Sequence, residues 1–390
     1  MISRQHKILD ILIYTSTIIV IFNFFSFVIE KSSVQYSDWL INYQGGFVRR
    51  AFIGEFFFKI FQLTKIPLDM IVFSFVSIFY IIFAILFSRI LKKIKLNFLN
   101  ILIIISPISF IYPLMEQKVS GRKDIMFILA VAILALFLEK LKFKNQKYLI
   151  IFLALITTFS HSGFFVYTPI FMMIFVILNH KKKLAEIFRE MFFIASSFAI
   201  MFFLTIFNTS VDENSISKIC NSISIYLPNC GITDYISFLR WTLEYEIELV
   251  ETIWNAENYL IFYIPAFIVV NFPLMYAIYN TKINNKRYDK FNPLFIFLLI
   301  ILVTFPIYYI GADYGRYMYI GYISMMIVYF KCLSTRFLVE RKKIEISNKF
   351  FAAVIIFLFG FTWTIPHCCN NNLKFIYEKP FKQAIKYIKY

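Results

Sequence analysis

Long apolar runs, separated by short basic segments, recur along the whole of this 390-residue chain. A helix needs about 20 apolar residues to cross the hydrocarbon of a bilayer, with a range of roughly 17–25. Soluble domains are about 45–50% apolar and about 25% charged, whereas this chain is 60% hydrophobic and 16% charged. We therefore predict an all-α, polytopic integral membrane protein that forms a single membrane domain over residues 1–390.

The apolar runs predict about eleven transmembrane helices, several of them shorter than the norm. The first run follows Arg4 and Lys7 and has no small-residue cleavage site after it, so we expect a retained helix and a cytoplasmic N-terminus. The predicted spans are 8–29, 66–88, 98–113, 124–139, 148–160, 163–179, 191–208, 259–280, 293–310, 317–333 and 350–366.

The distribution of Lys and Arg sets the expected orientation. With the N-terminus inside, the short inner loops RILKKIK, EKLKFKNQK, NHKKKLAEIFR and NTKINNKRYDK are uniformly basic. Basic loops of this kind stay in the cytoplasm. The net charge of +17 is thus explained by basic cytoplasmic loops, and we expect no nucleic-acid partner.

Three segments are expected on the outer side. They are a first loop over residues 30–65, a large acidic and partly helical loop over 209–258, and a basic amphipathic tail over 367–390. Cys220 and Cys230 share the large loop, where oxidation is allowed, and the sequence leaves open whether they form a disulfide. The cysteines have no C-x-x-C or zinc spacing, so we predict no metal site from them.

The first outer loop holds an unusual density of glycine, arginine and acidic residues. Adjacent glycines permit close approach to a ligand, and adjacent arginines offer forked donors to phosphate or carboxylate. An outer arginine pair also runs against the positive-inside trend. The alternative is a turn with interfacial anchors that reach to lipid headgroups. The candidate residues are Asp38, Tyr43, Gly45, Gly46, Arg49, Arg50 and Glu55.

Three further outer turns carry residues that are costly near a membrane. Arg122 and Lys123 add positive charge, unless they belong to an ordinary solvated loop. His161 can act as a general base or as a neutral hydrogen-bond donor to phosphate, unless it only caps a hairpin turn. Asp313 and Arg316 lie three residues apart and either serve a function or only pair with each other.

Together these turns predict an anion-binding site at the outer ends of the helices. Arginines would neutralise a leaving diphosphate while a carboxylate or a histidine deprotonates an incoming sugar hydroxyl. Because the arginines supply the positive charge, we expect neither a metal nor another cofactor.

The chain resembles the bacterial membrane enzymes that polymerise the repeat units of O-antigen or capsular polysaccharide (Wzy-like), and the related GT-C glycosyltransferases. The resemblance rests on the length, the many spans, the sizeable outer loop, the arginine-rich outer turns, and the segments NYQGGFVRRAFIGE and ADYGRY. The first outer loop has no D-x-D or E-x-D pair, which disagrees with metal-dependent GT-C relatives.

This resemblance implies a GT-C-like fold and roles for individual residues. Asp38 matches the catalytic carboxylate of the first outer loop, with Glu55 as second choice. The arginines that would hold an undecaprenyl pyrophosphate are Arg49, Arg50, Arg122 or Arg316.

The expected function is polymerisation of undecaprenyl-pyrophosphate-linked oligosaccharide repeat units, with the active site on the outer face of a bacterial cytoplasmic membrane. One alternative is a transferase that adds a single sugar from a polyprenyl-phosphate donor. Another class is a flippase for the same lipid-linked oligosaccharide, which needs ionisable residues through the midplane and often paired halves. An O-acyltransferase activity would rely on His161, but this chain has no matching second His or Asn.

Expected partners are undecaprenyl-linked glycans, the bilayer, and other polysaccharide-assembly proteins such as a chain-length regulator.

Overall fold

A computed structural model describes residues 4–31, 33–206, 211–232, 234–257, 259–285, 290, 292–341, 348–368 and 374–375. These residues are mostly helical, which confirms the all-α part of the predicted fold class. Strand in the described part is limited to two small antiparallel sheets. One pairs β1 (Thr281–Ile283) with β2 (Leu338–Glu340), and the other pairs β3 (Trp363–Thr364) with β4 (Lys374–Phe375).

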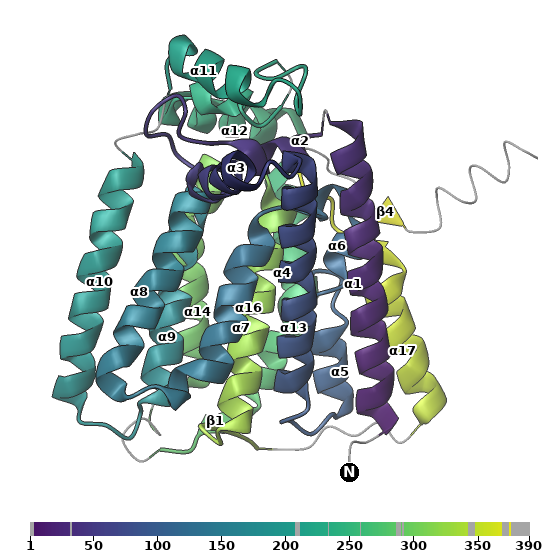
Figure 1. The fold of residues 1–390 in the computed structure, drawn as a ribbon. Helices are drawn as coiled ribbons and strands as arrows, with labels where there is room; N and C mark the ends of the chain where they lie inside the picture. The colour runs from purple at the N-terminus through teal and green to yellow at the C-terminus, as the bar shows by residue number, and fades with distance from the viewer. Residues whose placement is uncertain are drawn as a thin grey trace, which may run out of the picture.

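Five helices among the described residues are long and apolar enough to cross a membrane. They run roughly parallel through the molecule in Figure 1. Each coincides with a span that the sequence predicts. They are α1 (Arg4–Glu30), α4 (Leu68–Leu91), α10 (Leu184–Ile206), α13 (Tyr259–Tyr279), and α14 (Pro293–Thr304) continued by α15 (Pro306–Ile310).

The other predicted spans fall on shorter, broken or less apolar helices, so a total of eleven crossings stays a prediction. Proline breaks the third span, because Pro107 and Pro113 cannot donate a helical hydrogen bond. These helices are α5 (Phe98–Ile104), α6 (Tyr112–Met115), α7 (Asp124–Phe137), α8 (Phe143–Ser160), the 3-10 helix η4 (Ser162–Tyr167) with α9 (Pro169–Leu178), α16 (Tyr314–Ser334) and α17 (Lys349–Phe361).

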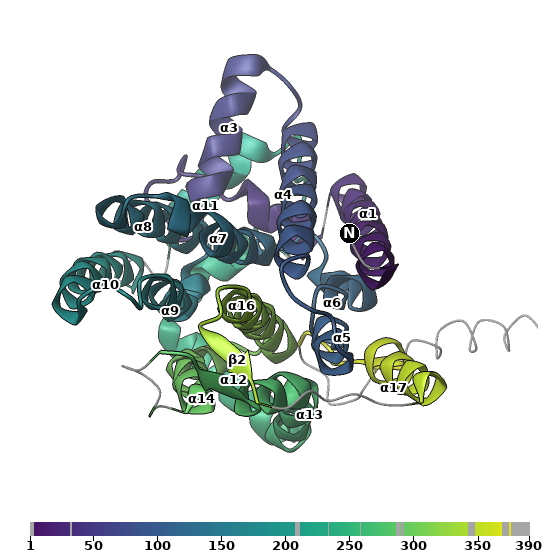
Figure 2. The same ribbon diagram turned by 90° about the horizontal axis from the view of Figure 1, so that it is seen from below.

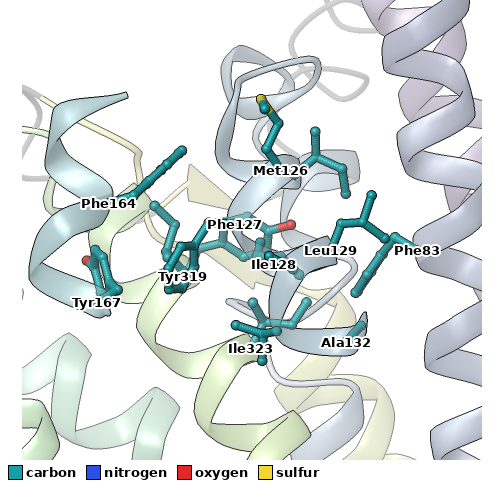
Figure 3. Close-up of a cluster of buried hydrophobic side chains, with 14 of the residues drawn as sticks. Phe83, Met126, Phe127, Ile128, Leu129, Ala132, Phe164, Tyr167, Tyr319 and Ile323 are labelled. Atoms are coloured by element: carbon teal, nitrogen blue, oxygen red, sulfur yellow. The ribbon is translucent and has the colours of Figure 1, made fainter. Parts of the chain in front are cut away.

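Two of these helices, α7 and α16, lie in the middle of the bundle when it is viewed along its axis (Figure 2). Both are buried along most of their length, so their side chains meet protein rather than lipid. Figure 3 shows the layer that they form with α4 and η4. Phe127 stacks on Phe171 with ring centroids 5.0 Å apart and also packs on Phe164 and Tyr167. This apolar layer begins about one turn along α7 from Asp124.

One end of the bundle carries a separate layer of short elements, which we call the outer end. It includes α3 (Phe52–Thr64), α11 (Glu213–Ile223) and α12 (Leu243–Glu257), while the N-terminus lies at the opposite end (Figure 1). The remaining members are α2 (Val34–Ser37) and the 3-10 helices η1 (Asp38–Leu40) and η5 (Ser237–Arg240).

The outer end therefore brings together the two loops expected over 30–65 and 209–258. Most of the tail expected over 367–390 lies outside the described residues. A disulfide joins Cys220 to Cys230, which answers the question that the sequence leaves open.

Candidate functional site

A cavity of about 530 Å³ lies beneath the outer layer. Its walls come from the first loop, the turns before α7 and α16, the turn after α8, and the segment that runs from η5 into α12. Five residues that the sequence singles out line it together, although they are far apart in the chain. They are Arg49, Arg50, Arg122, His161 and Asp313.

Arg316 is fully buried and connects three elements behind this cavity. Its Nε donates to both oxygens of Asp124 at 2.9 and 2.7 Å, which ties α16 to α7. Its Nη1 donates to Oδ2 of Asp313 at 2.8 Å, and its Nη2 lies 2.9 Å from Nε2 of His161. A guanidinium with donors in a fixed fork is suited to such a junction.

The contact with Arg316 fixes the protonation of His161. A guanidinium can only donate, so Nε2 of His161 accepts and the ring hydrogen is on Nδ1. Burial, together with the charges of Arg50 and Arg316, lowers the pKa of His161 well below its ordinary value. The ring is therefore neutral and offers an N–H. Of the two roles considered for His161, this geometry favours the hydrogen-bond donor over the general base.

Lys123 and Asp38 form an ion pair whose members are both 0% exposed. The ammonium lies 3.2 Å from Oδ1 of Asp38 and donates at 2.8 Å to the backbone oxygen of Arg50. Burial lowers the pKa of Lys123 to about 8, against the raising effect of Asp38. Neither Lys123 nor Asp38 lines the cavity, so the pair supports the backbone beneath it.

Arg50 has a left-handed backbone with a φ of 70°, a conformation that is costly for any residue except glycine. This conformation is held in part by the hydrogen bond from Lys123. The guanidinium lies 4.9 Å from the ring centre of Tyr235, and that of Arg122 lies 5.5 Å from the same ring. Two cations thus contact one aromatic side chain in the cavity wall.

Both arginines, and the histidine, carry hydrogen-bond capacity that the described part of the chain does not use. Arg50 Nε, Arg122 Nη1 and His161 Nδ1 are buried there without a hydrogen-bond partner. A buried donor without a partner costs about 1–3 kcal/mol. The nearest carboxylate to Arg122 is Asp313, whose Oδ2 lies 3.8 Å from Nη1. Although burial raises the pKa of Asp313, the charges of Arg122 and Arg316 hold it below its ordinary value.

Arg49 has a different task from its neighbour. Its Nη2 donates to the backbone oxygens of Phe238 and Trp241 at 3.0 and 3.1 Å and to Oε1 of Glu246 at 2.9 Å. These bonds attach the first loop to the segment that leads into α12. Arg49 therefore fixes one wall of the cavity to another.

The remaining predicted residues lie outside the cavity lining. Glu55 accepts from the backbone N–H of Tyr43 at 2.9 Å and closes the first loop on itself. Gly45 touches α11 so closely that a Cβ would lie 2.2 Å from the backbone oxygen of Ser215. Gly46 makes a turn with a φ of 107°. For these four residues, the described contacts are structural.

Several cavity residues were not predicted from the sequence. Glu246 was expected only as one of many acids in the large loop. The aromatic residues Tyr235, Phe238 and Trp241 carry a weak signal, namely their regular spacing of three. His367 and Cys368 come from a segment after α17 and also line the cavity.

Asp313, His367 and Cys368 have ligand atoms within 4.8 Å of one another, so they were considered as a metal site. The donor set fits a cation poorly. Cys368 is disulfide-bonded and offers no thiolate, and Oδ2 of Asp313 already accepts from Arg316. A cation here would also face two guanidinium groups.

Comparison of the chain with models of known families, with curated proteins and with solved structures gave no match.

Proposed function

We propose that this chain is a membrane glycosyltransferase that polymerises polyprenyl-diphosphate-linked glycan repeat units at the outer end of its helices. One observation carries the proposal. Buried donor atoms beside one cavity, among them those on Arg50, Arg122 and His161, have no acceptor in the described part of the chain. A diphosphate bound in the cavity would supply anionic oxygens for them.

The charges around the cavity support this reading. Arg49 is paired with Glu246, Lys123 with Asp38, and Arg316 with Asp124. After these pairs are set aside, Arg50 and Arg122 remain, both against Tyr235, with Asp313 3.8 Å from Arg122. An anion that contacts both guanidinium groups would gain charge-assisted hydrogen bonds.

In the proposed reaction a sugar hydroxyl of the acceptor attacks the anomeric carbon of the donor glycan. A new C–O bond forms, and the bond from that carbon to the diphosphate oxygen breaks. The electron pair of the broken bond leaves with the polyprenyl diphosphate, whose added charge Arg50, Arg122 and the N–H of His161 stabilise.

The proton of the attacking hydroxyl passes to Asp313, which acts as general base. Its lowered pKa keeps the carboxylate ionised before the reaction. Oδ2 is occupied by Arg316, while Oδ1 has no hydrogen bond among the described contacts. This assignment moves the base from Asp38 and Glu55, which the sequence suggests, to a carboxylate that lines the cavity.

A lipid carrier also fits the apolar part of the site. Ile253 of α12 and Ile307 of α15 line the cavity, while the adjacent residues Trp254 and Tyr308 line a second, almost entirely apolar space of about 830 Å³. That space is bounded by α13, α14 and α16. Many of its lining side chains are exposed, so in a membrane this apolar groove would face lipid and offers a place for an isoprenoid chain next to the diphosphate site.

The packing below the cavity speaks against a flippase. Such a protein needs polar residues along a path through the midplane. After Asp124, α7 carries no charged residue up to Phe137, and α16 carries none between Arg316 and Lys331. Buried apolar side chains of the two helices, among them Phe127 and Tyr319, lie in the layer of Figure 3.

The test is complementation of a strain that lacks this chain. We expect the wild type to restore long surface polysaccharide, whereas Asp313→Asn and Arg122→Ala leave it short and accumulate complete lipid-linked repeat units, measured by mass spectrometry. Arg240→Ala is the matched control, since Arg240 pairs with Glu213 away from the cavity. If the variants instead accumulate a lipid-linked glycan that lacks one sugar, the proposed activity is wrong and the chain is a single-sugar transferase. Repeat units trapped on the inner leaflet would overturn the enzyme reading in favour of a flippase.

A further inference from the structure

Four aromatic side chains follow one another along η5 and the start of α12. The ring centroids of Tyr235 and Phe238 are 5.0 Å apart, those of Phe238 and Trp241 are 4.3 Å apart, and those of Trp241 and Tyr245 are 5.2 Å apart. The first three line the cavity. We call these four residues the aromatic shelf.

The shelf has a direction. Tyr235 is buried, and its ring contacts the guanidinium groups of both Arg50 and Arg122, which mark the proposed diphosphate site. Phe238 and Trp241 are half-buried, and Tyr245 is 47% exposed. The aromatic faces therefore lead from the anion site to the outer surface of the protein.

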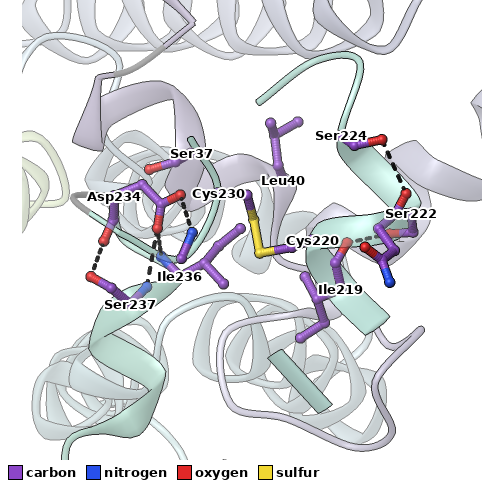
Figure 4. The surroundings of a disulfide bond; sticks show 12 residues. Ser37, Leu40, Ile219, Cys220, Ser222, Ser224, Cys230, Asp234, Ile236 and Ser237 are labelled. Carbon is purple, nitrogen blue, oxygen red and sulfur yellow. Dashed lines mark hydrogen bonds between the residues drawn. A yellow bond between two sulfur atoms is a disulfide. The ribbon is translucent and has the colours of Figure 1, made fainter. Parts of the chain in front are cut away.

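The shelf is also fixed before any ligand arrives. Arg49 holds the backbone oxygens of Phe238 and Trp241. The carboxylate of Asp234 accepts from the backbone N–H groups of Gly231, Ile236 and Ser237, and a disulfide closes the loop just before it (Figure 4). Rigid binding surfaces lose little conformational entropy when a ligand binds.

Such a surface matches the chemistry of sugars. One face of a pyranose ring presents C–H groups that pack on aromatic faces, while its hydroxyls need donors and acceptors at the edges. The ion pair of Arg49 and Glu246 lies beside Phe238 and Trp241 and offers both. A surface meant only for internal packing would not combine half-exposed rings with a charged pair along a cavity wall.

We propose that the aromatic shelf binds the sugar residues of the lipid-linked glycan, so that the diphosphate rests between Arg50 and Arg122 while the glycan extends outward over Phe238 and Trp241. This inference rests on the proposed function and adds a subsite for the carbohydrate part of the substrate. It assigns the large outer loop a role in recognition as well as in closing the cavity.

The experiment compares two probes on the purified full-length protein in lipid nanodiscs. One is polyprenyl diphosphate without sugar, and the other is the lipid-linked repeat unit extracted from the strain that lacks this chain. Dissociation constants are measured for the wild type, Trp241→Ala, Trp241→Phe and Phe238→Leu. The control is Tyr226→Ala, an aromatic residue of the same outer layer whose ring packs on Phe61 instead.

For the wild type we expect tighter binding of the glycosylated probe. Trp241→Ala should weaken that binding about tenfold and leave the sugar-free probe within about twofold, while Trp241→Phe restores most of the loss. Equal wild-type affinity for the two probes would overturn the shelf proposal and leave the diphosphate site standing. Parallel loss of both probes in Trp241→Ala would reduce the shelf to a structural element. If neither probe binds the wild type, the proposed function itself fails.

Discussion

The ammonium of Lys123 lies 3.2 Å from Oδ1 of Asp38, and both side chains are wholly shielded from solvent. Because the same ammonium donates to the backbone oxygen of Arg50, this pair connects a buried carboxylate to the conformation of a cavity residue. Asp38 can therefore have a structural or a catalytic role, and substitution distinguishes them. Loss of a buried structural carboxylate lowers stability, whereas loss of a catalytic one lowers activity.

For Asp38→Asn we expect a loss of about 3–5 kcal/mol in stability, because the ammonium of Lys123 is left buried without a counter-charge. The double variant Asp38→Asn with Lys123→Met should recover much of that loss. Thermal midpoints in detergent measure both effects. An Asp38→Asn protein with an unchanged midpoint and no transferase activity would restore the catalytic role that the sequence suggests.

Because the backbone of Arg50 is left-handed, two substitutions can distinguish the effect of backbone strain on stability from the effect of the guanidinium on ligand binding. Arg50→Gly and Arg50→Ala both remove the guanidinium, so both should bind polyprenyl diphosphate roughly 10–100-fold more weakly than the wild type. Glycine tolerates the φ of 70° and alanine does not, so the glycine variant should be more stable than the alanine variant by about 1 kcal/mol. Wild-type affinity in both variants would remove Arg50 from the anion site.

The neutral state of His161 predicts a pH dependence of stability. Its pKa in the folded protein lies below the unfolded value of about 6.5, so the folded state binds fewer protons below that pH. The stabilising contribution is complete above pH 6.5 and is lost as the pH falls, by up to about 1.4 kcal/mol per pH unit. Thermal midpoints between pH 6.5 and 5 should fall less steeply in His161→Gln. Identical slopes would show that the imidazole takes up a proton freely.

The disulfide should contribute stability and report the compartment of the large loop. Its cysteines are 10 residues apart, and closing a loop of that size is worth about 3 kcal/mol. Cys220→Ser should lower the thermal midpoint accordingly. In membranes from living cells we expect Cys220 and Cys230 to resist alkylation until a reductant is added. Immediate alkylation of both would place the loop in a reducing compartment.

Topology can be tested at positions where a new cysteine fits. Ile225 is 77% exposed in the outer layer, and Lys140 is an exposed residue in the 3-10 helix (Leu138–Lys140) that follows α7 at the end opposite Asp124. In a variant that lacks Cys332 but keeps the Cys220–Cys230 disulfide, an impermeant maleimide added to intact cells should label Ile225→Cys and spare Lys140→Cys. The reverse pattern would invert the predicted orientation. Gly121 and Gly315 are unsuitable, because a Cβ there would lie 1.9 Å from Phe24 and 2.2 Å from the oxygen of Pro366.

The sequence predicts the composition of the cavity better than the roles of its residues. Arg50, Arg122, His161 and Asp313 stand out because ionisable groups are costly near apolar helices, and this cost is visible without a structure. The sequence suggests Asp38 as the base but does not show that its carboxylate is buried against Lys123, because this pairing depends on how two distant turns meet. No local pattern in the chain encodes that contact.

The fold too is only partly predictable from the sequence. The long apolar helices follow from hydropathy alone, whereas the turn at Ser106 and Pro107 divides one predicted span into α5 and α6. The central position of α7 and α16 was also not predicted, because an apolar run reads alike whether lipid or protein surrounds it. The roles of Glu246 and Trp241 were missed since the acidity of their loop was interpreted only as a sign of sidedness.

Arg49 is synthesised 197 residues before Glu246, and Asp124 is synthesised 192 residues before Arg316. In the predicted orientation the first loop must therefore remain unpaired outside the membrane until the large loop has been exported, and the carboxylate of α7 must remain unpaired until α16 is made. The cavity exists only in a chain translated almost to its end. A product that stops before α16 would retain unmatched charges within its bundle, which marks it for quality control rather than for partial activity.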